Sequence, residues 1–323
     1  MAATTDTLSA AYRALTETCG LVDRSERGKL ALTGGEAKAF LQGQVTNDVE
    51  ALEPGRGCYA AFLTHKGKML GDMRVLDVGE ELLLDTERVS LQELFNMIRR
   101  FKLGRDVELH KRTLELGLLS LVGPHARRIA GATSLGSREH DNAREKVGGI
   151  DVILVATDTG VDVFCAAGDT AAVRAALEAA GAVPVTEEAA EIVRVERGRP
   201  RYGVDLDESS MPQEAGLNDR AVSFTKGCYV GQETVARLFY RGKPNRHLRG
   251  LRLSGPGAKG DALRLGEKEV GRLASVVVSP AHGPIALALV RREAEPGATV
   301  AVGDGDTTAE VVELPFRQLP LSA

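Results

Sequence analysis

The sequence contains no tryptophan, and aromatic residues make up only 4% of its 323 positions. Proteins that bind single-stranded nucleic acid depend on aromatic rings on which the bases stack, so this scarcity argues against such a binder. The formal net charge of −4 gives no overall attraction to a phosphate backbone either. We therefore expect no nucleic-acid partner, although a local basic groove would be compatible with this composition.

Cysteine is also scarce and scattered. The four cysteines are Cys19, Cys58, Cys165 and Cys228, and no two of them form a CxxC pair. A local zinc knuckle or ferredoxin-type cluster loop therefore has no support, and we expect no metal ligands of that kind. The first residues carry no secretory signal, and no stretch approaches the roughly 20 apolar residues needed to cross a bilayer. We expect a cytoplasmic protein with reduced thiols and no membrane partner.

The chain is longer than one compact core usually organises, so two or three lobes are expected. Over residues 1–113 and 114–245, short strand-like runs with hairpin signals alternate with helices. This pattern predicts two α+β lobes with antiparallel sheets and disfavours a doubly wound parallel sheet. From residue 246 to 323 the runs are strand-like throughout, with Gly and Pro between them, as in a small closed or sandwich-like β domain. Within it, Glu269–Val278 is predicted as one strand.

The clearest helix is predicted after Ser90. Four apolar residues between Leu91 and Ile98 recur at i, i+3, i+4 and i+7, which gives one apolar face. Ser90 followed three residues later by Glu93 predicts a capping box at the start of this helix.

The segment with the strongest chemical signal is Lys226–Glu233, which reads KGCYVGQE. Its two glycines allow the backbone to bend sharply around Cys228. Helix-forming residues follow from Gln232, so the loop is predicted at a helix N-terminus, where main-chain N–H groups carry partial positive charge. Together with the charge of Lys226, this would favour a thiolate at Cys228, as in a reactive cysteine or a soft-metal ligand. The residues alone leave a second interpretation open, in which Cys228 is a small buried hydrophobe in a glycine-rich turn.

The KGCYVGQE segment resembles the signature of the YgfZ-type folate-binding proteins, a branch of the aminomethyltransferase (glycine cleavage T-protein) superfamily. Further blocks resemble the family's pattern in the same order, from about residue 20 to about residue 245. These blocks are Gly20–Ser25 with Leu32–Gly34, Phe40–Asp48 (FLQGQVTND), Arg194–Pro200 (RVERGRP) and Met211–Leu217 (MPQEAGL).

The resemblance implies a fold, a cofactor and a role. The implied fold is a folate-binding, aminomethyltransferase-like α+β fold, with antiparallel lobes around a central channel and a C-terminal β-barrel domain. The implied cofactor is tetrahydrofolate or a one-carbon derivative of it. The implied role is the assembly or repair of proteins that carry four-iron, four-sulfur clusters, so iron–sulfur client or assembly proteins would be the partners. Cys228 is the residue most closely tied to that role, with Lys226 as its neighbour in the signature.

The same resemblance gives other residues expected roles. Glu196 matches the glutamate that holds the pterin ring, since one carboxylate can accept from a ring N–H and an amino group together. Asn47, Tyr229 and Gln232 are expected at the folate site, and Arg237 is expected to meet the anionic glutamyl tail. The alternatives are an ion pair with a neighbouring arginine for Glu196, an Asx turn for Asn47 and a surface ion pair for Arg237.

Asp72 is the remaining candidate. It matches an acidic residue near the reactive folate nitrogens of the superfamily's aminomethyltransferases, but the adjacent position, also acidic there, is Gly71 here. This difference argues against routine aminomethyl transfer, which needs acid–base control at a nitrogen, and Asp72 could equally be a strand-edge carboxylate. The leading hypothesis is a tetrahydrofolate-binding assembly factor. The alternatives are a tetrahydrofolate-dependent aminomethyltransferase or demethylase, and a binding module that has lost folate, so whether any reaction is catalysed is left open.

Overall fold

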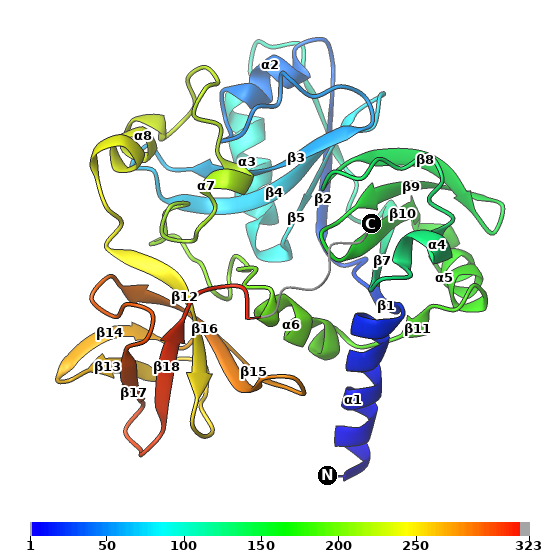
Figure 1. Ribbon diagram of the computed structural model, residues 1–323. Coiled ribbons are helices and arrows are strands. Elements are labelled where there is room, and N and C mark those ends of the chain that lie inside the picture. Colours follow the sequence, from blue (N-terminus) through cyan, green and yellow to red (C-terminus); the bar gives the residue numbers. More distant parts are fainter. Residues whose placement is uncertain (1, 317–323) are drawn as a thin grey trace.

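Three β-sheets and the helices packed on them make up the molecule (Figure 1). The computed structural model describes the backbone of residues 2–316 and the side chains of residues 7–316. The chain enters through helix α1 (Ala2–Glu17), which the sequence analysis did not predict. Within the described residues, no helix combines the length and apolar character needed to cross a membrane.

The first sheet has five antiparallel strands in the order β3-β4-β5-β2-β6. The elements of this part are β2 (Gly28–Thr33), α2 (Ala37–Gln42), β3 (Arg56–Leu63), β4 (Met69–Asp77), β5 (Leu82–Thr86), the short 3-10 helix η1 (Arg88–Ser90), α3 (Leu91–Phe101) and β6 (Glu108–Lys111). Helices α2 and α3 cover one face, where their apolar residues share a buried core with Met73 and Val75 of β4. Because side chains alternate along a strand, Asp72 and Arg74 point to the opposite face.

The second sheet has six strands in the order β11-β1-β7-β10-β9-β8. Its elements are β1 (Gly20–Asp23), β7 (Leu116–Val122), α4 (Ala126–Ala130), β8 (Asn142–Val147), β9 (Ile150–Ala156), β10 (Gly160–Ala166), the 3-10 helix η2 (Ala167–Asp169), α5 (Thr170–Ala179) and β11 (Val183–Pro184). Strand β1 pairs antiparallel with β7 and parallel with β11. The second sheet therefore takes one strand from the segment that precedes the first sheet, so the two lobes are tied together by the path of the chain.

The two sheets also meet through an apolar contact. Leu76 and Leu83 of the first sheet pack against Leu118, Val155 and Phe164 of the second, and all five side chains are buried. This contact fixes how the two sheets face one another and positions the polar residues beside it.

The last sheet has seven antiparallel strands in the order β14-β13-β17-β18-β12-β16-β15 and curls into a half-barrel around its own core. The strands are β12 (Arg246–Leu253), β13 (Ala262–Leu265), β14 (Lys268–Arg272), β15 (Ser275–Ser279), β16 (Gly283–Arg291), β17 (Thr299–Val302) and β18 (Thr308–Val312). The expected α+β fold with a C-terminal β domain is confirmed.

One predicted strand of this sheet is wrong. Glu269–Val278 is divided between β14 and β15, which lie at opposite edges of the sheet. The chain crosses between them at Leu273, whose N–H donates to the carbonyl of Asp261, and at Ala274, whose N–H donates to the carbonyl of Leu287. Leu273 at the crossing is buried in the curled sheet and Ala274 is half-buried, so the apolar run looked continuous in the sequence.

Three further helices connect the sheets. They are α6 (Glu187–Glu196), α7 (Asn218–Ala221) and α8 (Gln232–Arg241). Helix α6 packs against α1 and β15, and α7 packs against β3. Gly231, just before α8, has φ +85°, and a Cβ there would lie 2.6 Å from the carbonyl oxygen of Thr64. The loop before α8 can therefore approach the first sheet only with glycine at this position.

The predicted capping box at α3 is wrong. Ser90 ends η1 and has a helical conformation, with φ −88° and ψ −12°, and its side chain makes no capping hydrogen bond. Because η1 runs directly into α3, the preceding turn already occupies the place where a cap would begin.

Candidate functional site

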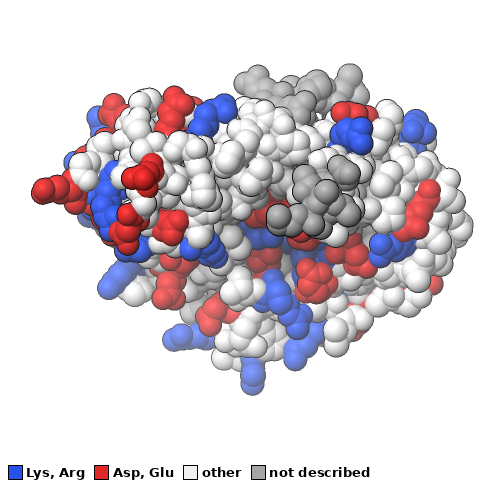
Figure 2. Space-filling view, turned by 90° about the horizontal axis from the view of Figure 1, so that it is seen from below, with Lys and Arg blue, Asp and Glu red and all other residues white. Residues whose placement is uncertain are grey.

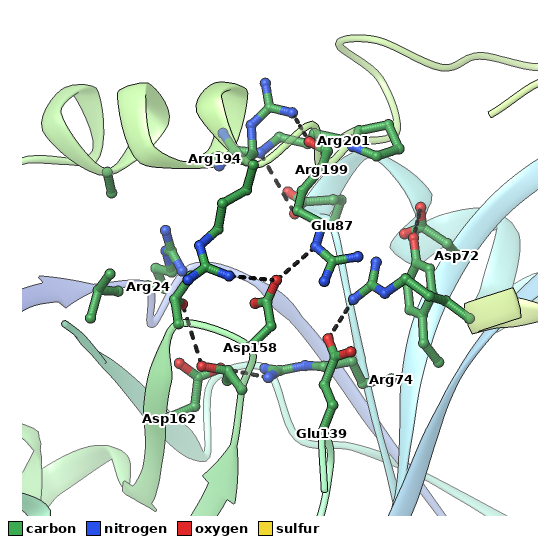
Figure 3. Close-up of a pocket in the computed structure, with 18 of the residues that line it drawn as sticks. Arg24, Asp72, Arg74, Glu87, Glu139, Asp158, Asp162, Arg194, Arg199 and Arg201 are labelled. Atoms are coloured by element: carbon green, nitrogen blue, oxygen red, sulfur yellow. Dashed lines mark hydrogen bonds and ion pairs between the residues drawn. The ribbon is translucent and has the colours of Figure 1, made fainter. Parts of the chain in front are cut away.

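A polar pocket lies where β3 and β4 of the first sheet face β10 of the second, with α6 along one side (Figure 3). Its enclosed space is about 210 Å³. Eight arginines and five carboxylates line it, so its wall carries an excess of positive charge. The arginines are Arg24, Arg27, Arg74, Arg194, Arg197, Arg199, Arg201 and Arg220, and the carboxylates are those of Asp72, Glu87, Glu139, Asp158 and Asp162. Such a wall suits a ligand with negative charge.

Asp72 differs from the other four carboxylates of the wall. Each of the others pairs with an arginine, whereas Asp72 forms no ion pair within the described part of the chain. It is 5% exposed, and the hydroxyl of Tyr59 donates to its Oδ2 at 2.7 Å. Burial raises the pKa of Asp72 to about 6, although the hydrogen bond from Tyr59 acts in the opposite direction. A carboxyl group with this pKa can hold or release a proton near neutral pH.

Gly71 lies on the other face of β4. A Cβ at this position would lie 2.6 Å from the ring of Phe62 and 2.7 Å from Cβ of Ser90. The glycine is therefore required by packing, and an acidic side chain there would point away from the pocket. Gly71 consequently gives no reason to doubt acid–base chemistry at Asp72, contrary to our expectation from the sequence.

Arg74 joins the two sheets at the pocket. It pairs with Asp85 of β5 at 2.7 Å and with Asp162 of β10 at 2.5 Å, and Arg27 also holds Asp85 at 2.9 Å. Burial alone would raise the pKa of Asp85, but the two arginines outweigh it and lower the value to about 2. Asp85 is thus ionised at any physiological pH and holds both arginines in place.

Asp158 occupies the middle of the pocket wall, between two guanidinium groups (Figure 3). Arg199 lies 2.7 Å from its carboxylate and Arg197 lies 3.7 Å away. Burial alone would raise the pKa of Asp158, but these arginines lower it. Nε of Arg197 is buried and has no hydrogen-bond partner among the described residues, so a donor is left over beside the pocket. Arg220 pairs with Glu139 and lies 5.2 Å over the ring of Tyr59.

Among the residues that line the pocket, the sequence analysis named only Asp72 as a site residue; besides the arginines, it missed Tyr59 and His140. Tyr59 bonds Asp72, and His140 lies beside it, with ring centroids 6.5 Å apart. His140 has φ +72°, and burial lowers its pKa to about 4, so its ring is neutral at pH 7. The sequence contained one signal for the polar face of β4, since Asp72 and Arg74 interrupt an apolar strand at alternate positions. Nothing comparable marks His140.

Glu196 is buried but does not line the pocket. It is 1% exposed, and the hydroxyl of Tyr12 donates to both of its oxygens, at 2.9 and 3.2 Å. The hydroxyl of Ser279 donates to Oε1 as well. These bonds connect the end of α6 to α1 and to β15, so the structure does not bring Glu196 and Asp72 together.

The KGCYVGQE loop places Cys228 on the outside and the side chains of Lys226 and Tyr229 on the inside. Cys228 is a free, exposed cysteine, which excludes the small buried hydrophobe. The side chain of Lys226 points inward, where Nζ donates to the carbonyls of Gln42, Val45 and Asn47 at 2.6, 2.7 and 2.8 Å. Burial lowers the pKa of Lys226 to about 8. Lys226 therefore anchors the loop to the segment after α2, and its ammonium group is committed to these carbonyls.

The other residues expected at the folate site also lie outside the pocket. Tyr229 is 7% exposed and packs in a core with Leu63 and Val235. Gln232 is the first residue of α8, and Arg237 is exposed on the same helix. In the part of the chain that the structure describes, Arg237 forms no ion pair with Glu233, four residues earlier.

The side chain of Asn47 forms hydrogen bonds with backbone groups. Its amide donates to the carbonyls of Tyr59, at 2.8 Å, and Arg220, at 3.1 Å, and its Oδ1 accepts from the N–H of Asp48. It thus fixes the backbone of two residues whose side chains line the pocket. Among residues 7–316, no group of three or more His, Cys, Asp and Glu side chains is arranged to hold a metal ion.

Two family models match the chain. The model described as the GCVT N-terminal domain matches residues 2–226, and the model described as the glycine cleavage T-protein C-terminal barrel domain matches residues 246–317. The chain therefore belongs to the glycine cleavage T-protein family.

Individual relatives agree with this assignment. The chain is 31% identical over 321 residues to an aminomethyltransferase of Rubrobacter xylanophilus, covering 96% of this chain and 86% of the relative. It is 30% identical over 316 residues to a chloroplastic protein of Arabidopsis thaliana, named provisionally as a transferase, covering 94% and 73%. The crystal structure of the glycine cleavage system aminomethyltransferase T from Bartonella henselae covers 97% of this chain and 90% of its own, with a TM-score of 0.85 and 22% identity. At that identity the likeness shows the fold alone.

Proposed function

We propose that the protein binds tetrahydrofolate, or a one-carbon derivative of it, in the polar pocket. The observation that carries this proposal is the buried Asp72 carboxyl group, which has no ion pair among the described residues in a wall where every other carboxylate has one. An acid left unpaired beside an excess of arginine favours a ligand that supplies both a nitrogen for the acid and anionic groups for the arginines. Membership of a family that includes aminomethyltransferases supports the choice of a folate.

In this proposal, Asp72 contacts a nitrogen of the reduced pterin and Tyr59 fixes the orientation of its carboxyl group. The arginines around Asp158 meet the glutamyl carboxylates, for which Arg197 Nε offers a donor without a partner among the described residues. Ligand pockets usually enclose about 300–1,000 Å³. The enclosed space here, about 210 Å³, holds the ring system, and the remainder of the ligand extends toward solvent.

Calorimetric titration of the full chain with tetrahydrofolate tests the proposal. We expect saturable binding of one ligand per chain, with affinity lowered in Asp72→Asn and kept in a variant of an exposed acid such as Asp151→Asn. The absence of any binding heat, together with unchanged thermal stability in the presence of the ligand, would remove the folate proposal.

We further propose that the protein belongs to the YgfZ-type branch and acts in the assembly or repair of iron–sulfur proteins through Cys228. The support is the KGCYVGQE signature and the exposure of the Cys228 thiol on a loop that Lys226 and Tyr229 hold in place from the inside. The expected cytoplasmic location belongs to this proposal and stays a prediction.

Complementation of cells that lack the protein tests this role, with the activity of a four-iron, four-sulfur enzyme as the readout. We expect Cys228→Ala to fail and Thr225→Ala, at the exposed position just before the loop, to restore activity. Full restoration by Cys228→Ala would remove the proposed role of the loop and leave the folate proposal standing.

A second candidate is one-carbon transfer to or from tetrahydrofolate, as an aminomethyltransferase or demethylase. It is favoured by one observation, the placement of Asp72 in the pocket with its pKa near 6 while Gly71 faces the core. This candidate predicts turnover of tetrahydrofolate with an aminomethyl or N-methyl donor. That turnover would be abolished in Asp72→Asn and kept in Cys228→Ala, whereas an assembly factor is expected to lose its function in Cys228→Ala.

A further inference from the structure

The outer face of α8 carries aromatic and basic side chains. Val235 faces the core and is fully buried, whereas side chains on the opposite side of the helix are exposed. Tyr240, on the outer side, is 67% exposed, whereas Phe239, one turn after Val235 and near the same side of the helix, is 46% exposed at the C-terminal end of α8. Together with neighbouring residues they form what we term the aromatic–basic patch, which comprises Phe224, Arg237, Phe239, Tyr240, Arg241 and Lys243.

The aromatic rings of the patch are ordered before any partner arrives. Phe224 and Phe239 stack with centroids 3.8 Å apart and an interplanar angle of 15°, and Tyr240 meets Phe239 edge-on at 5.0 Å. Rings held in this way lose little conformational freedom on binding, which is why ordered aromatic residues dominate the energetics of protein interfaces. A cluster of exposed rings on a single protein therefore indicates a contact surface.

The positive charges of the patch are not neutralised within the described chain. Arg237, Arg241 and Lys243 are exposed, and none of them forms an ion pair among residues 7–316. On the face shown in Figure 2, by contrast, basic and acidic side chains lie interspersed. At the exposed end of α3, Arg100 lies 5.3 Å over the ring of Phe101, so that cation already has an aromatic partner. The patch is complementary in charge to an acidic surface.

The patch and the Cys228 loop form one structural unit. Phe224 precedes the loop and Phe239 belongs to the helix that follows it, so their stacking closes the loop against α8. Figure 1 shows α8 at the outer edge of the molecule, beside the first sheet and away from α6, which borders the pocket. A macromolecule bound to the patch would therefore lie next to the exposed thiol without covering the pocket.

We propose that the aromatic–basic patch docks an acidic segment of the protein partner on which Cys228 acts. The purpose of the docking rests on the proposed role of Cys228, but the docking itself can be measured independently. A nucleic acid fits less well, because Phe224 and Phe239 already cover one face of each other, which leaves fewer free ring faces on which bases could stack.

Photocrosslinking in living cells tests the docking. A photoreactive benzoylphenylalanine replaces Tyr240 in the full chain, and the crosslinked peptides are identified by mass spectrometry. The same group in place of Phe101, 47% exposed at the end of α3, is the matched control for an exposed aromatic position.

Arg241→Glu with Lys243→Glu reverses the charge of the patch, and Arg99→Glu with Arg100→Glu is the matched reversal on α3. Thermal unfolding confirms that each variant is folded.

We expect protein adducts from position 240 whose crosslinked peptide is rich in Asp and Glu, with a yield about tenfold lower after charge reversal in the patch and unchanged after reversal on α3. Replacing the acids of that peptide by lysine in the partner should restore the yield with the reversed patch. Adducts to nucleic acid, adducts to peptides without excess acid, a yield insensitive to charge reversal, or no adducts above the level at position 101 would each overturn the proposal. Restoration of enzyme activity by Cys228→Ala would instead remove the proposed role of the thiol and leave the docking result intact.

Discussion

At the scale of single residues, the protein separates three acids that the sequence could not distinguish. Asp72 is buried and pairs with no cation among the described residues, Asp85 is buried between two arginines, and Glu196 is buried among hydroxyl groups. The pKa values of the two aspartates follow from these surroundings: burial raises the pKa of Asp72 to about 6, and the arginines lower that of Asp85 to about 2. Only Asp72 is placed to exchange a proton with a ligand.

Removing the acid at position 72 should stabilise the protein at high pH. The unfolded chain releases this proton near pH 4 and the folded chain near pH 6, so the folded state binds more protons in that window. The free energy of unfolding therefore falls as pH rises from about 4 to 6, by about 2–3 kcal/mol. We predict that Asp72→Asn raises the melting temperature at pH 8 and leaves it unchanged at pH 4. Calorimetric melting curves at both values check this, with the exposed Asp151→Asn as control; an Asp72→Asn protein less stable than wild type at pH 8 would contradict it.

Glu196 should contribute to stability more than to ligand affinity. The Gln side chain keeps the shape of Glu196, but Tyr12 donates to both carboxylate oxygens and the amide nitrogen of Gln cannot accept, so one of these bonds is lost. We predict that Glu196→Gln lowers the free energy of unfolding by about 1–2 kcal/mol and leaves the affinity for tetrahydrofolate unchanged. Urea denaturation and calorimetric titration of the same preparation measure the two quantities. A loss of affinity with unchanged stability would show instead that Glu196 holds the pterin ring.

At the scale of elements, strand alternation decides which residues of β4 reach the pocket. The even positions Asp72 and Arg74 face the second sheet, and Gly71, Met73 and Val75 face the helices. A comparison by sequence position alone treats Gly71 and Asp72 as equivalent neighbours. The glycine at position 71 therefore argued against acid–base chemistry, whereas in the fold this position points away from the pocket.

Adding a methyl group at position 71 should destabilise the protein without affecting the pocket. The new Cβ would lie within 2.7 Å of the Phe62 ring and of Ser90, which are both buried. We predict that Gly71→Ala lowers the free energy of unfolding by about 1–3 kcal/mol and that the folded variant binds tetrahydrofolate like wild type. Gly305→Ala is the control, since a Cβ there meets nothing within 4 Å. Weaker binding by fully folded Gly71→Ala would mean that this face of β4 does communicate with the ligand.

Lys226 should hold the Cys228 loop in place. Without its ammonium group the three carbonyls after α2 lose their shared donor. We predict that Lys226→Met lowers the free energy of unfolding by about 1–3 kcal/mol. It should also accelerate amide hydrogen exchange selectively in residues 42–47 and 226–231. Lys243→Met, at an exposed position just after α8, is the control. Unchanged exchange in both segments would refute this anchoring role.

At the scale of the whole molecule, sequence patterns predicted the architecture better than the site. The fold class and the C-terminal β domain followed from periodicity and resemblance, because hydrophobic spacing and glycine positions are local properties of the chain. The arginine-rich pocket could not be predicted, since the fold brings together residues more than a hundred positions apart in the sequence, from Arg24 after β1 to Arg220 in α7. Resemblance assigned Glu196 to the ligand, but its neighbours Tyr12 and Ser279 come from α1 and β15, and sequence spacing does not reveal such contacts.

The most direct measurement is the affinity for tetrahydrofolate between pH 5 and pH 8, in wild type and in Asp72→Asn. Because the pKa of Asp72 is about 6, the carboxylate that accepts from a ligand nitrogen forms as the pH passes that value. We predict that wild-type affinity rises through pH 6 and that Asp72→Asn binds more weakly, with no inflection there. Equal affinities and identical pH profiles for the two proteins would contradict a folate site built around Asp72.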